Sequence, residues 1–174
     1  MILSGKHAEE NVIYNYKGSI YPEYLKNGNA VGHIEQIASQ FCKGKGLDIG
    51  GFYGWTLPGA IPINIADKIL DYDAYNLPAH SELDYIFSSH CLEHLTDPIK
   101  ALEYWIDHLM SGGTLFLYLP HPDMAYWRPE NNRKHLHMWQ PTEMADIFNA
   151  LGLENVINSE RDMYWSYSVV GFKK

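Results

Sequence analysis

The chain has 174 residues, of which 46% are hydrophobic and 20% charged, a composition that is ordinary for one globular domain and excludes a disordered, collagen-like or low-complexity protein. Thirteen Lys and Arg against 21 Asp and Glu give a net charge of −8, so no general basic field exists to hold a nucleic acid backbone. Two cysteines are too few for a disulfide framework, and no apolar run is long enough for a signal peptide or a membrane span, so we expect a cytoplasmic protein without nucleic acid or membrane partners.

Hydrophobic periodicity predicts alternating helices and strands. Residues 30–43 are typical of an amphipathic helix, because apolar side chains recur every three or four positions and Gly44 follows the last of them. Residues 46–50 form a short apolar run closed by glycines, which is typical of a buried strand. Similar runs predict strands at 61–65 and 84–88.

The second half of the chain continues this alternation. Its predicted elements are a helix that begins at Asp97-Pro98 and runs to about residue 110, a strand over 114–119 that ends at Pro120, a helix over about 142–151 with Thr142 as cap and Gly152 as end, and strand structure within 162–172. Strands alternating with helices imply an α/β fold with a doubly wound, mostly parallel sheet. Such sheets bind ligands beyond the carboxyl ends of their strands, so the chemistry is expected in the loops that follow them.

The loop after the first of these strands contains Gly50, Gly51 and Gly54, so its backbone can turn sharply and come close to a ligand. Only eleven residues, 50–60, separate the first two predicted strands, and Pro58 interrupts them, which leaves no room for a full helix. A dinucleotide places its pyrophosphate at a helix N-terminus. The short loop therefore favours a ligand without phosphate, held through hydroxyl, amine and carboxylate groups.

Four segments resemble, in the same order, motifs of the class I S-adenosylmethionine-dependent methyltransferases, and the resemblance covers about residues 45–172. The four are Asp48 with the glycine loop, the stretch 73–78 (DAYNLP), the stretch 83–95 with its strand and following turn, and the stretch 110–115 (MSGGTL). The resemblance implies a seven-stranded Rossmann-like sheet with an antiparallel C-terminal hairpin in a three-layer sandwich.

The same resemblance implies S-adenosylmethionine as the cofactor. Asp48 would order the loop and meet the amino group of the cofactor, and Asp73 would accept a hydrogen bond from the adenine amine. The implied cofactor-binding residues are Asp48, Gly50, Gly51, Phe52, Gly54, Asn64, Asp67, Asp73, Ala74, Leu77, Ser89 and His90.

Two of these residues depart from the family pattern. Phe52 stands where the family loop has its middle glycine, and a side chain there disfavours a positive φ. Asn64 aligns with the acidic residue that holds the ribose hydroxyls; Asn can accept one bond and donate another, but without the charge assistance of a carboxylate. Asp67, three residues further on, could take the place of that acidic residue. These departures motivate a rival hypothesis, a non-catalytic binding module that keeps the fold and has lost the cofactor.

His90, Glu93 and His94 also spell His-x-x-Glu-His, the inverted zinc-peptidase signature, which gives a zinc hydrolase as a less favoured alternative. Under the methyltransferase hypothesis the catalytic candidates are His94, His90, Glu93 and His121, and no metal is expected. His94 would lie near the acceptor and take its proton as the methyl group arrives. Capping of the turn or packing by His94 is an equally open reading.

Residues 120–140 form a long predicted loop at the carboxyl end of the strand over 114–119, where it would bind the acceptor. Its rings can stack on a sugar and its cations can meet a phosphate or carboxylate, and the candidates are Tyr126, Trp127, Arg128, Arg133, His135 and His137. The alternatives are a solvated loop whose aromatic rings pack on the core, and a metal held by the pair His135 and His137.

Residues 1–30 contain four tyrosines, Tyr14, Tyr16, Tyr21 and Tyr24. Because a variable N-terminal segment folds over the cofactor in the family, we expect an aromatic cover here; an aromatic edge or a dimer contact would use the same residues.

The whole chain, 1–174, is interpreted as a single methyltransferase-like domain, monomeric or homodimeric. It is expected to methylate an oxygen or nitrogen of a small molecule. A likeness of residues 130–139 to methyltransferases of surface-glycan assembly favours a sugar or nucleotide sugar.

Overall fold

The computed structural model describes residues 13–22, 30–52, 55–64, 72–78 and 82–174. Its helices and strands follow in chain order as β1 (Ile13–Tyr16), β2 (Ser19–Pro22), α1 (Val31–Phe41), β3 (Gly46–Ile49), β4 (Ile61–Ile63), β5 (Leu83–Ser89), the 3₁₀ turn η2 (Leu92–His94), α2 (Pro98–His108), β6 (Leu109–Pro120), the 3₁₀ turn η3 (Ala125–Trp127), α3 (Pro141–Ala150), β7 (Glu154–Asn158) and β8 (Ser166–Phe172). None of the described helices is long and apolar enough to cross a membrane.

Six strands form one mixed sheet in the order β4-β3-β5-β6-β8-β7. The four strands β4, β3, β5 and β6 are parallel, and β8 runs antiparallel to both β6 and β7. From β3 the chain goes to β4 on one side and then returns to β5 on the other. The switch in strand order therefore lies between β3 and β5, and their carboxyl ends define the expected ligand edge.

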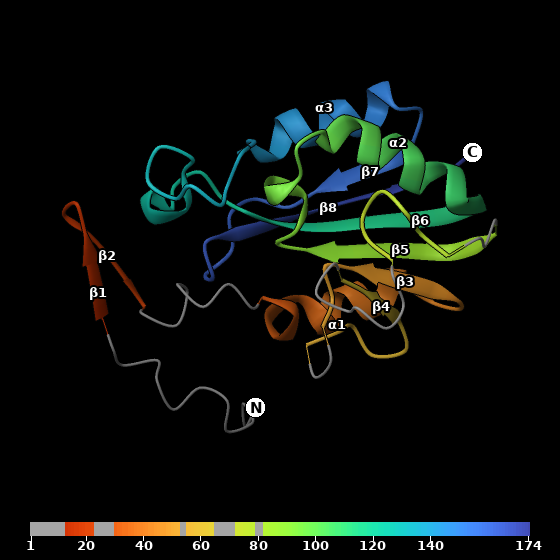
Figure 1. Cartoon of the computed structure of the whole chain (residues 1–174), viewed down its shortest axis with the longest axis horizontal. Helices are drawn as coiled ribbons and strands as arrows, with labels where there is room; N and C mark the ends of the chain where they lie inside the picture. Colours follow the sequence, from red (N-terminus) through yellow and green to blue (C-terminus); the bar gives the residue numbers. More distant parts are fainter. Residues whose placement is uncertain (1–12, 23–29, 53–54, 65–71, 79–81) are drawn as a thin grey trace.

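Helices cover both faces of the sheet, so the molecule has three layers (Figure 1). Helix α1 packs on one face against Tyr85, Phe87, Phe116 and Tyr118, which alternate along β5 and β6. Helices α2 and α3 cover the opposite face, where their buried side chains meet the intervening residues of the same two strands. Two buried faces explain why the middle of each of these strands is largely apolar, because side chains on both faces are covered there.

The predicted doubly wound α/β fold with an antiparallel C-terminal hairpin is confirmed. The described residues form six strands of the main sheet where seven were expected. Three details differ. β6 begins at Leu109 instead of residue 114, β7 at Glu154–Asn158 was not predicted as a separate strand, and α3 is capped by Gln140 instead of Thr142. Gln140 and Glu143 form a reciprocal capping box, which satisfies backbone groups that Thr142, already inside the helix, cannot reach.

Strands β1 and β2 form a separate antiparallel hairpin that lies apart from the main sheet, beside the segment that follows β6 (Figure 1). The hairpin contributes Tyr21 to a small third core with Met124 and Trp127, and Tyr16, Tyr126 and Trp165 pack around it. Tyr16 and Tyr21 thus join the aromatic residues of the loop over 120–140 in one cluster, whereas Tyr24 and the side chain of Tyr14 lie outside the described part of the chain.

Candidate functional site

The loop after β3 makes a tight bend at the switch point. Gly50 has a φ of +93°, and its N–H donates to the Ile63 carbonyl at 2.8 Å, which ties the bend to β4. A Cβ on Gly50 would lie 2.6 Å from the Cβ of Cys91, and one on Gly51 would lie 2.6 Å from the carboxyl carbon of Asp48. Both glycines are therefore required, because the backbone here passes too close to its neighbours for a side chain.

Asp48 lies beneath this bend and is fully buried. One carboxylate oxygen, Oδ2, accepts the Leu57 N–H at 2.7 Å, whereas Oδ1 is buried without a hydrogen-bond partner among the described residues. Burial raises the pKa of Asp48 to about 7, and the bond from Leu57 only partly opposes that rise. Asp48 thus orders the loop and leaves one polar atom for a ligand.

The two departures from the family pattern have clear positions. Phe52 is not among the described residues with a positive φ; its ring is 46% exposed, and its carbonyl accepts the Trp55 N–H at 2.7 Å. The sharp turn is made at Gly50, so a side chain at position 52 causes no backbone strain. The side-chain amide of Asn64 donates to the Gly50 carbonyl at 3.1 Å and helps to fix the bend. Gly54 and Asp67 lie outside the described residues.

A second turn, Asp73–Leu77, is held against helix α2. Oδ1 of Asp73 accepts the Tyr75 N–H at 2.7 Å, and the Ala74 carbonyl accepts the indole N–H of the buried Trp105 at 2.7 Å. The Leu77 N–H donates to the Tyr104 hydroxyl at 3.1 Å. Helix α2 therefore fixes the position of the turn whose Asp73 is the candidate adenine contact.

The end of β5 carries Ser89 and His90, side by side with the bend after β3. Ser89 Oγ is buried without a hydrogen-bond partner in the described part of the chain. His90 has a φ of +47°, its Nε2 lies 2.9 Å from Ser166 Oγ, and its ring meets Trp127 edge to face. Burial lowers the pKa of His90 to about 3, so this imidazole is neutral and packed between strands.

Glu93 and His94 form the turn η2. The Glu93 side chain has no exposed surface, both of its carboxylate oxygens lack a hydrogen-bond partner among the described residues, and burial raises its pKa to about 8. His94 is 39% exposed and its Nδ1 lies 2.7 Å from the Lys134 carbonyl. The stretch 90–94 is a strand end followed by a 3₁₀ turn, not the helix on which the inverted zinc-peptidase motif places its two histidines.

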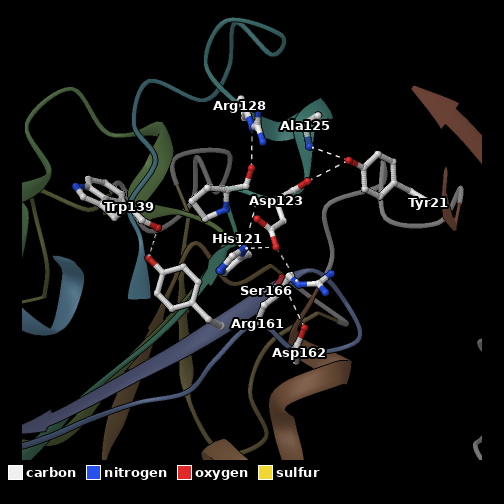
Figure 2. A network of polar contacts seen from close by, with 11 residues as sticks. Tyr21, His121, Asp123, Ala125, Arg128, Trp139, Arg161, Asp162 and Ser166 are labelled. Atoms are coloured by element: carbon white, nitrogen blue, oxygen red, sulfur yellow. Dashed lines mark hydrogen bonds and ion pairs between the residues drawn. The ribbon is translucent and has the colours of Figure 1, made fainter. Parts of the chain in front are cut away.

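His121 lies at the end of β6 in a polar network with the N-terminal hairpin (Figure 2). Its Nδ1 accepts the Asp123 N–H at 3.2 Å and lies 3.6 Å from Asp123 Oδ2, which also pairs with Arg161. Burial lowers the pKa of His121. Tyr21 of β2 donates from its hydroxyl to the Asp123 carbonyl and accepts the Ala125 N–H, each at 3.1 Å. Nothing in the sequence pattern pointed to Asp123 or Arg161 in this network.

The loop over 120–140 uses much of its polar and aromatic content to hold itself together. Trp127 is buried, Tyr126 packs edge to face on Tyr16, and Arg128 donates from Nε to the Pro122 carbonyl at 2.7 Å (Figure 2). Arg133 is exposed. Of the candidate acceptor ligands in this loop, the structure therefore presents Arg133 to solvent and gives Trp127 and Arg128 packing contacts.

The segment that carries the last two candidates, His135 and His137, lies against the turn η2. His135 is buried beside His94, with ring centroids 4.7 Å apart, and His137 stacks on Trp139. A metal held by the pair His135 and His137 was only an alternative to the expected site without metal; in the structure His135 comes together with Glu93 and His94, all three offering ligand atoms within 4.8 Å of one another. Sequence spacing gave no signal for this contact, because it joins residues some forty positions apart through a loop.

A family model described as a methyltransferase domain matches residues 30–157. No curated protein matches the chain significantly in sequence. A solved structure of an S-adenosylmethionine-dependent methyltransferase from Thermotoga maritima, a candidate histamine N-methyltransferase, is 17% identical, with a TM-score of 0.69 over 86% of this chain and 92% of that one.

Two archaeal structures are similar to the same degree. A candidate methyltransferase of Haloferax volcanii, solved in complex with the activator Trm112, is 15% identical with a TM-score of 0.65, over 85% of this chain and 90% of that one. An S-adenosylmethionine-dependent methyltransferase of Archaeoglobus fulgidus is 15% identical with a TM-score of 0.63, over 86% and 94%. At these identities the likeness shows the shared fold.

Proposed function

The chain belongs to the class I S-adenosylmethionine-dependent methyltransferases, and on this premise we propose that it methylates an oxygen or nitrogen of a small polar molecule, with a sugar or nucleotide sugar as the first candidate. The observation that carries the proposal is a pair of buried polar atoms at the switch point of the sheet, Asp48 Oδ1 and Ser89 Oγ, which have no hydrogen-bond partner among the described residues. A polar atom buried without a partner is costly, so the pair supports a ligand that supplies the missing hydrogen bonds.

The residues present fit the cofactor. Gly50 and Gly51 let the bend pack closely on Cys91 and Asp48, which fixes the position of the loop, and the Asp48 oxygen can accept from an amino group. The described part of the loop over 50–60 contains no helix, in keeping with a ligand that has no phosphate to bind. When bound, the cofactor supplies a methyl group activated by its sulfonium. The protein holds the cofactor and the acceptor in position for methyl transfer.

The catalytic proposal concerns His94 at the acceptor side. Its Nδ1 faces the Lys134 carbonyl, which can only accept, so the neutral ring carries its proton on Nδ1 and leaves Nε2 as the free acceptor nitrogen. His90 and His121 are more buried and already take part in hydrogen bonds, which supports positioning roles for them. The exposed Arg133 supports an anionic group on the acceptor, because guanidinium binds phosphate and carboxylate in a bidentate manner.

Calorimetric titration with S-adenosylmethionine and with S-adenosylhomocysteine tests the cofactor half of the proposal, and heat with a stoichiometry of one per chain is expected. Absence of heat with both ligands would favour the non-catalytic module instead.

A panel of sugars, nucleotide sugars and small amines, incubated with the methyl-labelled cofactor, tests the acceptor. His94→Ala should then lower turnover by about 10²-fold while the affinity for S-adenosylhomocysteine stays unchanged. Unchanged turnover would return His94 to a structural role.

A further inference from the structure

Three side chains from two distant segments form a cluster at the turn η2: Glu93, His94 and His135, here called the Glu-His-His cluster. Each offers one ligand atom, and these atoms all lie within 4.8 Å of one another. Around a tetrahedral ion with bonds of about 2.0 to 2.2 Å, ligand atoms lie about 3.4 Å apart. Small changes of side-chain rotamer would therefore bring the three onto one ion.

Glu93 is the unusual member of the cluster. Its carboxylate has no exposed surface and makes no hydrogen bond to the described residues, while Nδ1 of His90 and Nε2 of His94 approach Oε1 only to 3.8 Å. No lysine or arginine ion pair to it occurs in the described chain. A buried carboxylate without partners is strongly disfavoured, and coordination of a cation is one of the few ways to compensate for its lost hydration.

His94 is oriented as a metal ligand would be. Its Nδ1 lies 2.7 Å from the Lys134 carbonyl, so this nitrogen donates and Nε2, which faces Glu93, keeps its lone pair. The Nε2 lone pair and the Glu93 carboxyl group thus face each other at 3.8 Å. A second hydrogen bond that fixes the tautomer and the ring plane is the usual companion of a metal-bound histidine.

His135 completes the cluster in the same way. Its ring is buried, Nδ1 has no hydrogen-bond partner among the described residues, and the imidazole forms a hydrogen bond with the backbone of Trp127. The segment that carries it is tied to Glu93, because the N–H groups of Leu136 and His137 both donate to the Glu93 carbonyl, at 2.8 and 3.2 Å. The backbone therefore holds the three side chains together without help from an ion.

We propose that Glu93, His94 and His135 bind one divalent transition-metal ion. Two imidazoles and one carboxylate suit Zn²⁺ and its neighbours Mn²⁺, Fe²⁺ and Co²⁺ better than Ca²⁺ or Mg²⁺, which prefer oxygen ligands alone. Three protein ligands leave coordination positions open, and the partial exposure of His94 places solvent at the cluster. The site stands on the geometry of the cluster and does not depend on the identity of the acceptor, but an ion bound to Nε2 of His94 would occupy the lone pair that the catalytic proposal uses to take a proton.

The test uses the full chain, freed of metal by a chelator and dialysed. Titration with Co²⁺, followed by its visible absorption, and with Zn²⁺ and Mn²⁺, followed by calorimetry, should show one site per chain. His94→Ala and His135→Ala should weaken binding by about 100-fold or more, since each removes one of three ligands. His108→Ala is the matched control, because His108 also contacts a backbone carbonyl, that of Tyr104 at 2.8 Å, but lies outside the cluster.

Glu93→Gln separates metal binding from a structural role. The amide keeps the size of the side chain and removes the buried charge, so the metal-free variant should be at least as stable as metal-free wild type, while the rise in Tm caused by Zn²⁺ should disappear. Absence of binding to wild type by any of the three ions would overturn the proposal. Binding that survives in all three cluster variants, or falls equally in His108→Ala, would overturn it too. S-adenosylhomocysteine affinity, measured on the same samples, reports separately on the cofactor site.

Discussion

At the scale of single residues, the carboxyl group of Asp48 links the site to stability. Burial raises its pKa in the folded protein from 3.8 to about 7, so between these values the folded state keeps a proton that the unfolded state has released. Because of this group, the free energy of unfolding falls as pH rises from about 4 to about 7. Above about pH 7 the group adds no further pH dependence.

Asp48→Asn should remove that pH dependence. The amide oxygen can still accept the Leu57 N–H, but the side chain no longer titrates. The stability of the variant relative to wild type should increase between about pH 4 and pH 8, by up to about 4 kcal/mol. Urea unfolding of both proteins across this range measures the difference, and two parallel curves would contradict the prediction. Cofactor affinity should fall in the same variant.

Two adjacent serines at the end of β5 offer a matched pair. Ser88 Oγ donates to the Ile49 carbonyl at 2.8 Å, whereas Ser89 Oγ is buried with no partner in the described chain. Ser88→Ala should cost about 1 kcal/mol of stability, and Ser89→Ala less than about 0.5 kcal/mol. The affinity for S-adenosylhomocysteine should show the reverse order, with Ser89→Ala weaker by about tenfold. Equal affinity in wild type and Ser89→Ala would remove Ser89 from the cofactor site.

At the scale of elements, how well the sequence predicted a segment depends on how it is buried. Helix α1 and strand β3 lie nearly where the hydrophobic pattern predicted them, because the apolar positions in each sequence are the positions that the fold buries. Strand β7 was missed since most of its residues are exposed at the sheet edge, which leaves no alternation to detect. β6 starts early because Leu109 already pairs with Leu83 and the Gly112 N–H donates to the Lys173 carbonyl. The intervening polar and small residues are exposed and look like a turn in the sequence.

The glycine bend after β3 can be tested against a glycine with similar backbone and no neighbours. Gly50 and Gly59 have φ values of +93° and +87°, but a Cβ on Gly59 would meet no atom of the described residues within 4 Å. Gly59→Ala should cost about 1 to 2 kcal/mol for its backbone alone. Gly50→Ala should cost a further 1 to 3 kcal/mol or so, because its Cβ would overlap Cys91. Denaturant unfolding measures both, and equal losses would show that the close approach is relieved at no cost.

At the scale of the whole molecule, cofactor binding and folding are linked. A ligand that binds only the folded chain adds about 2.7 kcal/mol to the free energy of unfolding at a concentration of 100 Kd. For a domain of 174 residues this corresponds to a rise in Tm of roughly 5 to 10 °C. S-adenosylhomocysteine should produce such a shift and NAD should not, because the short crossover between β3 and β4 offers its pyrophosphate no helix N-terminus.

A comparable rise in Tm with NAD would contradict this account of the bend, and no rise with S-adenosylhomocysteine would contradict the cofactor assignment.

The candidate site contains both parts that the sequence predicts and parts that it does not. Motifs local to one strand end, such as Asp48 with Gly50, were predictable, since few residues set their geometry. The meeting of His135 with Glu93 was not, because it depends on the path of the loop over 120–140 and on backbone bonds between distant segments.

The hairpin of β1 and β2 makes its described polar contacts with the segment after β6, through Tyr21 to Asp123 and Ala125 and through Lys17 to Asn131. The glycine bend and Asp48 lie on other elements. Sequence changes in the hairpin are therefore expected to alter the segment after β6, where we propose that the acceptor binds, and to leave the glycine bend after β3 unchanged. A chimera that carries the hairpin of a homologue would be a direct way to ask whether acceptor preference travels with these few residues.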